Sequence, residues 1–204
     1  PPLEGERLME LDELVRALAE NGAKGTRAGL LNGFGLHLNP ELWDSDLNAT
    51  SLRRVLQAYL LMSPSLREQI QVDFTRSLLP FVATFGDDYL RHVLRPDYDP
   101  DMTTLINDYI AFNPTRNREL DMLPVFAHID GERVRSRLQD EKISSRPTFH
   151  WRLPNADLEN PNWSISHEWE RWLSVETLAI DDTRLTESID HWARERARPW
   201  LERI

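Results

Sequence analysis

The sequence has no cysteine among its 204 residues. This absence excludes disulfide bonds, thiolate metal sites and a cysteine nucleophile, and it makes the cytoplasm the expected compartment. Lysine is nearly absent as well, with two lysines against 22 arginines, so guanidinium groups carry almost all of the positive charge. A formal net charge of −10 without a basic block argues against a dedicated nucleic-acid-binding protein, because such binding depends on neutralising phosphates.

Long apolar runs are missing too, and none approaches the roughly 20 residues that span a membrane, so no membrane partner is expected. The chain also lacks the motifs Gly-x-x-x-x-Gly-Lys, Gly-x-Gly-x-x-Gly, Gly-x-Ser-x-Gly and His-Glu-x-x-His, which excludes the usual nucleotide-binding and hydrolase signatures. It begins Pro1-Pro2-Leu3, without an initiator methionine or a signal-peptide pattern. We expect a single domain over residues 1–204 that forms the C-terminal part of a longer protein.

Apolar residues recur at helical spacing along most of the chain. Ser63-Pro64 resembles a cap followed by proline at the first helical position, so a helix is expected to end at residue 62 and another to begin there. Asp99-Pro100 repeats this signal before the next apolar stripe. The pattern predicts helices over about 8–18, 50–62, 66–94 (with breaks near Pro80 and Gly86), 102–110, 131–138, 165–180 and 184–198.

Two segments, 33–39 and 148–153, alternate apolar and polar residues with the period of a β-strand. Because helices dominate and only two strands are predicted, the expected class is α+β, mostly helical with a small antiparallel sheet. If the two strands are neighbours, their polar residues converge on one concave surface; these residues are His37, Asn39, Thr148, His150 and Arg152. Imidazoles can ligate metals, and arginine binds phosphate or carboxylate oxygens. The alternative is a sheet whose outer face is simply polar and half-solvated, although Gly35 inside the first strand favours a bulge or a nearby ligand.

Further candidates lie outside these strands. Arg116 and Arg118 follow the helix predicted at 102–110, and Arg146 precedes the second strand; together they could bind an anion, but they could equally be ordinary surface arginines. Glu176 continues the apolar stripe of the helix predicted at 165–180. It would lie either at the edge of that stripe, which is favoured, or inward with a partner. Six of the seven tryptophans occur from Trp151 onward, which predicts an aromatic core or an oligomer contact.

Three stretches carry a resemblance to a known family: GLHLN at 35–39, NPTRNRELDMLP at 113–124 and RPTFHWRLPN at 146–155. At these positions the chain resembles the putative amidoligase family, which is grouped with carboxylate–amine ligases of the glutamine synthetase and glutamate–cysteine ligase fold. The resemblance extends from residue 1 to about residue 179. It implies a curved antiparallel sheet that forms a cup for ATP and divalent metal, with the N-terminal strands of the cup absent from this chain.

In that family fold, ATP phosphorylates a substrate carboxylate, and an amine then displaces phosphate to leave an amide. The resemblance implies small-molecule or peptide carboxylate and amine substrates, with ATP and Mg²⁺ as cofactors. It implies that Arg152 and His150 are catalytic, that His37 and His150 are metal ligands, and that the ATP contacts are Arg116, Arg118, Arg146 and Asn39.

Two departures from the family pattern affect these expectations. His150 occupies the position of the glutamate in the Glu-x-Arg strand of the related ligases, and Mg²⁺ prefers oxygen ligands. The strand that carries a Glu-x-Glu pair in those ligases would precede Pro1. We therefore expect weak metal binding and little activity from this chain alone.

Two alternatives remain open at this stage. One is a non-catalytic binding or oligomerisation module of the same fold, with homo-oligomers formed through the aromatic C-terminal helices. The other is a metal-dependent hydrolase in which His37 and His150 bind a transition metal.

Overall fold

The computed structural model describes residues 7–25, 35–43, 46–71, 82–139 and 142–197. Within these ranges the chain is mostly helical and has one two-stranded antiparallel sheet, so the expected α+β class is confirmed. The helices are α1 (Leu8–Glu20), α2 (Ala49–Ile70), α4 (Asp87–Val93), α5 (Met102–Phe112), α6 (Leu123–Ile129), α7 (Gly131–Arg137), α8 (Ile165–Ile180) and α9 (Asp182–Ala197). The strands are β1 (Leu120–Asp121) and β2 (His150–Trp151).

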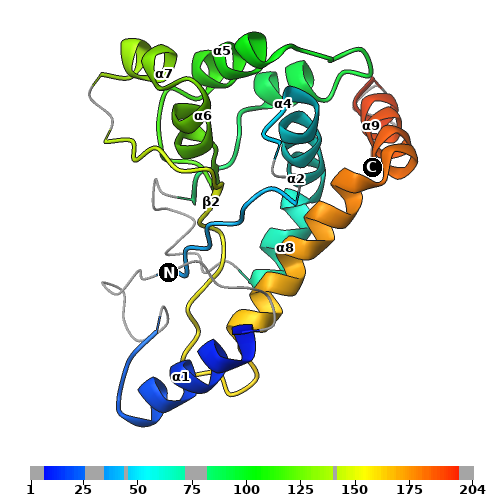
Figure 1. The fold of residues 1–204 in the computed structure, drawn as a ribbon. Helices are drawn as coiled ribbons and strands as arrows, with labels where there is room; N and C mark the ends of the chain where they lie inside the picture. Colours follow the sequence, from blue (N-terminus) through cyan, green and yellow to red (C-terminus); the bar gives the residue numbers. More distant parts are fainter. Residues whose placement is uncertain (1–6, 26–34, 44–45, 72–81, 140–141, 198–204) are drawn as a thin grey trace.

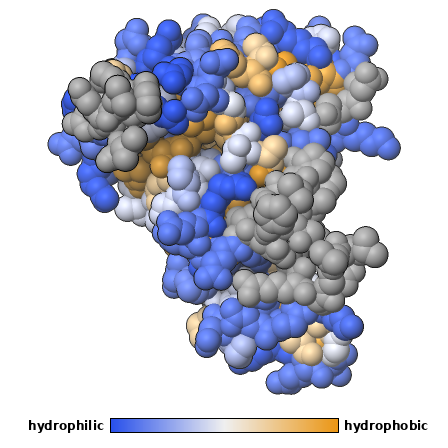
Figure 2. Space-filling view, turned by 180° about the vertical axis from the view of Figure 1, so that it is seen from behind, coloured by the Kyte–Doolittle hydropathy of each residue, from blue (hydrophilic) through white to orange (hydrophobic). Residues whose placement is uncertain are grey.

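The two long helices α2 and α8 pack against each other and form the spine of the molecule, and α9 packs on both (Figure 1). Helices α4 to α7 gather at one end of this spine, whereas α1 contacts α8 at the opposite end. Figure 2 shows the α1 end as a narrower lobe beneath a larger helical body, with hydrophilic side chains over most of the visible face. The sheet lies between the two ends.

Aromatic side chains fill the centre of the core. Trp172 of α8 is fully buried, and its ring lies 5.6 Å from the rings of both Phe149 and Trp151. Burial of these large rings contributes several kcal/mol each by order of magnitude. The predicted aromatic core is thus confirmed for Trp151 and Trp172, and this packing places the apolar side of the 148–153 segment against α8.

Several helix predictions are confirmed. Helix α8 has the predicted bounds, and α7 ends one residue before its predicted end. Glu176 is partly buried on α8, and its Oε1 accepts a 2.6 Å hydrogen bond from Trp172 Nε1. Burial raises the pKa of this carboxyl group, and the hydrogen bond from Trp172 opposes the shift. Glu176 therefore combines the two predicted environments, because it is partly exposed and also has an inward partner.

The predicted break at Ser63-Pro64 is wrong, because α2 continues through Pro64 to Ile70. Proline removes the N–H that would bond to the carbonyl of Leu60. However, Leu60, Ser63 and Leu66 are all buried. Tertiary packing on both sides of the proline therefore keeps the helix continuous. Part of the region predicted as helical between 66 and 94, including Pro80, lies outside the described residues.

Two smaller boundaries also differ from the sequence prediction. The N-cap of α5 is Asp101, whose side chain accepts a 2.7 Å bond from Thr104 N, rather than Asp99. The side-chain bond to the backbone decides the position of this cap. Strand β1 and helix α6 were not predicted, because both are too short to show a clear period.

The two predicted strands lie side by side, but they are less regular than expected. The segment from residue 35 to 41 joins the 148–155 segment through three isolated antiparallel bridges, Gly35 with Asn155, Leu38 with Trp151 and Glu41 with Thr148. The pairing register of the first bridge differs by one residue from the register that the other two bridges share. Such a shift is expected for an irregularity near Gly35. Residues 33 and 34 of the predicted first strand lie outside the described residues.

Candidate functional site

The site lies on the polar side of the short sheet. Phe149, Trp151 and Leu153 are buried in the core, and side chains alternate along an extended segment, so His150 and Arg152 point to the opposite side. Strand β1 runs antiparallel to β2, and its register places Asp121 directly across from His150. Residues paired in this way share one face of a sheet. The sheet therefore brings a carboxylate, an imidazole and a guanidinium together.

A buried tyrosine holds β1 in position. The hydroxyl group of Tyr109 on α5 donates to the carbonyl of Leu120 at 3.1 Å and accepts from the backbone N–H of Met122 at 3.2 Å. These two bonds lie on either side of Asp121. Burial raises the pKa of Tyr109 well above its usual value, so its proton is retained at physiological pH.

The carboxylate of Asp121 is fully buried and bound on both oxygens. Its Oδ1 accepts from the backbone N–H of Leu123 at 3.1 Å, which also holds the start of α6. Its Oδ2 accepts from Arg152 Nη2 at 2.8 Å and from Arg116 Nε at 3.1 Å. A buried charge needs partners of this kind, since desolvation alone would strongly disfavour it. Asp121 is thus the centre that aligns both arginines.

The imidazole of His150 completes the arrangement. Its Nδ1 lies 3.2 Å from Arg152 Nε and 3.4 Å from Arg116 Nη2. Nδ1 also lies 3.5 Å from Asp121 Oδ2, but the shorter contact is with Arg152 Nε, and a guanidinium group can only donate hydrogen bonds. This assigns Nδ1 of the neutral ring as the acceptor and the proton to Nε2. The ring of His37 stands edge-on to that of His150, with 5.0 Å between their centroids. We call the four residues Arg116, Asp121, His150 and Arg152 the arginine–aspartate cluster.

The cluster carries excess positive charge. Two guanidinium groups and one carboxylate leave a net charge of +1 when His150 is neutral. Exposure is graded: the side chain of Arg152 is 7% exposed, that of His150 15% and that of Arg116 25%. Burial lowers the pKa of Arg152, Asp121 raises it, and the positive charge of Arg116 lowers it further. An anion that contacts the exposed side of the cluster would relieve the repulsion between the two arginines.

A loop with two further cations borders the cluster. Arg116 Nη1 donates to the carbonyl of Lys142 at 2.7 Å, which ties this loop to the site. Four residues later, the backbone N–H of Arg146 donates to the carbonyl of Pro124 at 3.1 Å. The side chain of Arg146 is exposed. Arg146 therefore lies at the rim of the site rather than in it.

Two predicted site residues lie apart from the cluster. Arg118 Nε donates to Asn113 Oδ1 at 2.7 Å, and its guanidinium carbon lies 5.9 Å from the centre of the Phe85 ring. These contacts give Arg118 a local structural role. Asn39 is exposed between the bridges at Leu38 and Glu41, and no contact joins its side chain to the cluster. The structure thus groups His37, His150, Arg152 and Arg116, with Arg146 at the rim.

Sequence reasoning missed two acidic residues, Asp121 and Glu119. Both belong to the stretch 113–124 and are separated by one residue, Leu120. Strand β1 has only two residues, which is too short for a strand period to be recognised in the sequence. Glu119 is buried, accepts a hydrogen bond from Ser63 Oγ and pairs with Arg67 Nη1 at 2.6 Å. Burial raises its pKa, and the bonds from Ser63 and Arg67 oppose the shift. Glu119 therefore fixes the edge of the sheet to α2.

The residues that the structure describes do not form a good divalent-metal site. Among them no group of three or more histidine, aspartate or glutamate side chains is arranged to hold a metal ion. Both oxygens of Asp121 already accept hydrogen bonds, and His150 Nδ1 faces two guanidinium groups. Mg²⁺ requires several oxygen ligands in near-octahedral geometry. His37 and His150 as metal ligands therefore stay a prediction, since the described part of the chain adds no third ligand to them.

Comparison with known proteins gives one match. A family model described as "putative amidoligase enzyme" matches residues 1–174. The chain therefore belongs to this amidoligase family. No curated protein and no solved structure matches it. The glutamine-synthetase-like cup accordingly stays a prediction.

None of the described helices is both long enough and apolar enough to span a bilayer.

Proposed function

We propose that the protein is a ligase that joins a carboxylate to an amine through an acyl phosphate, and that the arginine–aspartate cluster binds the anionic reacting group. The observation that carries this proposal is the convergence of Arg116 and Arg152 on the buried carboxylate of Asp121. This arrangement fixes two guanidinium groups around one carboxylate, and the side chain of Arg116 stays partly exposed. Membership of the amidoligase family supports the same reaction class.

The residues of the cluster have distinct roles in this proposal. Arg116 is the most exposed member, so it meets the incoming anionic oxygen first. Arg152 lies deeper, and its bond to Asp121 fixes its direction. His150 presents its Nε2 proton as a hydrogen-bond donor, because its Nδ1 already accepts from the arginines. Preorganised donors of this kind stabilise developing negative charge without reorganisation during the reaction.

ATP, as the second substrate, supplies the phosphoryl group that activates the carboxylate. The carboxylate oxygen bonds to the terminal phosphorus as ADP leaves. The amine nitrogen then bonds to the acyl carbon, phosphate leaves with the cleaved C–O bond, and the nitrogen loses a proton. Arg116 and Arg152 would neutralise the charge on the transferred group, and Arg146 at the rim would contact the polyphosphate. The described residues do not fit Mg²⁺, so these proposed roles belong to the arginines.

Hydroxylamine trapping tests this proposal without knowledge of the natural amine. The assay uses residues 1–204, from which little activity is expected, and also an upstream-extended version of the protein. Each is incubated with ATP, hydroxylamine and pooled amino-acid and dicarboxylic-acid substrates, and the hydroxamates are measured colorimetrically and by mass spectrometry. We expect ATP-dependent hydroxamate formation that falls at least tenfold in Arg116→Gln, the size of effect expected when one charge-assisted contact in the transition state is lost.

Arg133→Gln is the matched control, because Arg133 of α7 is partly exposed, pairs with the N-cap residue Asp130 and has no described contact with the cluster. It should retain the activity of the unmodified protein. Absence of any ATP-dependent hydroxamate would contradict the ligase proposal and would favour a non-catalytic binding module. Equal activity in Arg116→Gln would reject the cluster as the reacting centre.

A further inference from the structure

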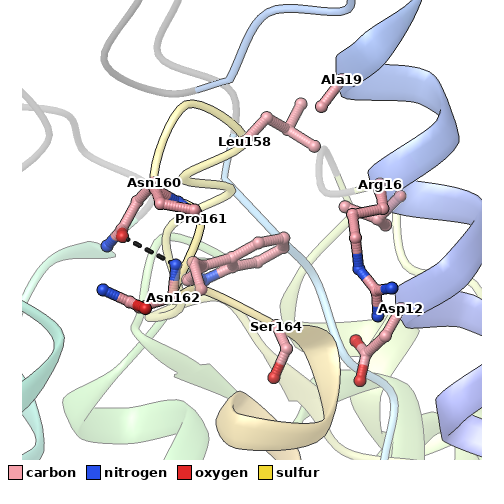
Figure 3. Close-up of a pocket in the computed structure, with 10 residues that line it drawn as sticks. Asp12, Arg16, Ala19, Leu158, Asn160, Pro161, Asn162 and Ser164 are labelled. Atoms are coloured by element: carbon pink, nitrogen blue, oxygen red, sulfur yellow. Dashed lines mark hydrogen bonds between the residues drawn. The ribbon is translucent and has the colours of Figure 1, made fainter.

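A pocket lies apart from the arginine–aspartate cluster and is lined by other residues. This pocket of about 320 Å³ lies between α1 and the loop that leads into α8 (Figure 3). Its lining residues are Asp12, Val15, Arg16, Ala19, Leu158, Asn160, Pro161, Asn162, Trp163 and Ser164. None of these belongs to the cluster. The volume is at the lower end of the range for small-molecule pockets, so it suits a ligand the size of one amino acid.

The pocket is lined by one acidic and one basic residue, Asp12 and Arg16, and only the acidic one is hydrogen-bonded. Asp12 and Arg16 lie one turn apart on α1. The carboxylate of Asp12 accepts its hydrogen bonds from the first turn of α8. Its Oδ1 accepts from the backbone N–H groups of Ile165 at 2.7 Å and Ser166 at 3.3 Å, and its Oδ2 accepts from Ser166 Oγ. No hydrogen bond or ion pair joins the guanidinium of Arg16 to another residue of the described chain. Among the residues that the structure describes, the guanidinium group of Arg16 is thus available to a ligand.

The remaining walls divide into a polar and an apolar part. The side chain of Asn162 makes no hydrogen bond within the described residues. The side-chain amide of Asn160 already makes two hydrogen bonds: its Oδ1 accepts from Asn162 N, and its Nδ2 donates to Asp157 Oδ2. Carbon-rich surface comes from Val15, Ala19, Leu158, Pro161 and Trp163. Figure 3 shows Arg16 across the pocket from Asn160 and Asn162, with Leu158 near one end and Ser164 near the other.

The loop that forms one wall is held in shape before any ligand binds. Asn160 N bonds to Asp157 O and Trp163 N bonds to Asn160 O, both at 3.0 Å. Glu159 Oε1 also accepts from Gly25 N at 3.0 Å. A Cβ at Gly25 would collide with the carbonyl oxygen of Ala156, so glycine permits the close approach of the two segments. A preformed wall lowers the entropic cost of binding.

From these observations we propose that the pocket binds a small carboxylate with an apolar body, such as an N-acylated aromatic or branched amino acid. Arg16 would pair with the carboxylate, Asn162 would donate to it or to the acyl oxygen, and the apolar wall would cover the side chain. A free α-ammonium group is disfavoured, because the lining carboxylate already accepts three bonds. This proposal does not rest on the ligase activity of the cluster.

Three probes separate the parts of the proposed ligand. N-acetyl-L-phenylalanine carries both the carboxylate and the apolar body, N-acetyl-L-phenylalaninamide lacks the charge, and acetate lacks the body. Each is titrated into ¹⁵N-labelled protein, and backbone and indole amide shifts are followed by NMR. We expect N-acetyl-L-phenylalanine to shift the amides of 158–164, and we expect the other two probes to bind at least tenfold more weakly.

Two variants complete the test. Arg16→Gln should weaken binding of N-acetyl-L-phenylalanine at least fivefold. Arg7→Gln should leave it unchanged, because Arg7, the N-cap residue of α1, is exposed, pairs with Glu10 and does not line the pocket. The proposal is overturned if acid and amide bind equally, if Arg16→Gln binds like the unmodified protein, or if the shifts map to 116–121 and 150–152 instead. Because the readout is binding at 158–164, its outcome is independent of hydroxamate formation.

Discussion

Asp121 shows how a single residue can organise a site while it stays inaccessible to solvent. Its carboxylate is 0% exposed, yet it accepts hydrogen bonds from two arginines and one backbone N–H. Removal of one partner from a buried ion pair leaves the other charge uncompensated, which is far more costly than loss of a surface pair. The two arginines should therefore differ in their contributions to stability.

Arg152→Gln should lower the free energy of unfolding by about 3 to 5 kcal/mol, because it leaves Asp121 with one charged partner in a buried setting. Arg116→Gln should cost only about 1 kcal/mol, since Arg116 is partly exposed and water can replace it. Urea unfolding followed by circular dichroism measures both values. Similar losses in the two variants would contradict the prediction that the more deeply buried arginine contributes more to stability.

Glu176 gives a pH-dependent prediction at the same scale. Burial raises its pKa above the ordinary value of 4.5, so the folded protein retains this proton where the unfolded chain has released it. The unmodified protein should therefore lose stability relative to Glu176→Gln as pH rises from below 4.5 through the raised pKa. Glutamine keeps an oxygen acceptor for Trp172 Nε1 but does not titrate.

Urea unfolding of both proteins at several values between about pH 4 and pH 8 tests this sign. Glu170→Gln is the matched control, because Glu170 is exposed on the same helix and should not change the slope. A stability difference between the unmodified protein and Glu176→Gln that stays constant with pH, or that grows in the opposite direction, would contradict the prediction.

At the scale of secondary-structure elements, α1 packs on α8, and the side chain of Asp12 adds hydrogen bonds between the two helices. No residue of α1 is buried, yet its Asp12 caps the first turn of α8. A carboxylate at a helix N-terminus both satisfies free N–H groups and interacts favourably with the helix dipole. The position of α1, and with it one wall of the pocket that Arg16 lines, depends on this contact.

Asp12→Ala should destabilise the protein by about 1 to 2 kcal/mol, the usual cost of losing an acidic cap. It should also speed hydrogen exchange at the amides of Ile165 and Ser166. Glu13→Ala is the control, since Glu13 is exposed on the neighbouring position of α1. If both substitutions have the same small effect, the cap does not hold α1 to α8.

The elements that could be predicted from the sequence are those with strong local signals. Helix α8 begins after Ser164, whose side chain accepts from His167 N, and it carries a clear apolar stripe. Strand β1 could not be predicted, because two residues carry no period and only pairing with β2 defines them. The continuity of α2 through Pro64 was also unpredictable, because it depends on burial by distant segments.

At the scale of the whole molecule, the site was predicted in part. Alternation alone indicated that His37, His150 and Arg152 would share a face, and the structure does bring them together. The role of Asp121 could not be read from the sequence, because it requires the register of a pairing between segments about 30 residues apart. Long-range register is set by tertiary packing, here by Trp151 on α8 and by Tyr109 under β1.

The local charge of the cluster is opposite in sign to the net charge of the protein. The formal net charge is −10, and yet the cluster and its rim carry a local excess of guanidinium groups. Exposed charges are screened over about 8 Å at physiological ionic strength, so the local excess decides what binds there. Binding of an anion at this site should therefore weaken as salt increases.

Isothermal titration of ATP tests the central claim that this cluster is an anion site for phosphoryl transfer. We expect saturable binding to the unmodified protein, at least tenfold weaker binding to Arg116→Gln, and unchanged binding to Arg133→Gln. No detectable binding to the unmodified protein at millimolar ATP, or equal affinity in Arg116→Gln, would contradict it.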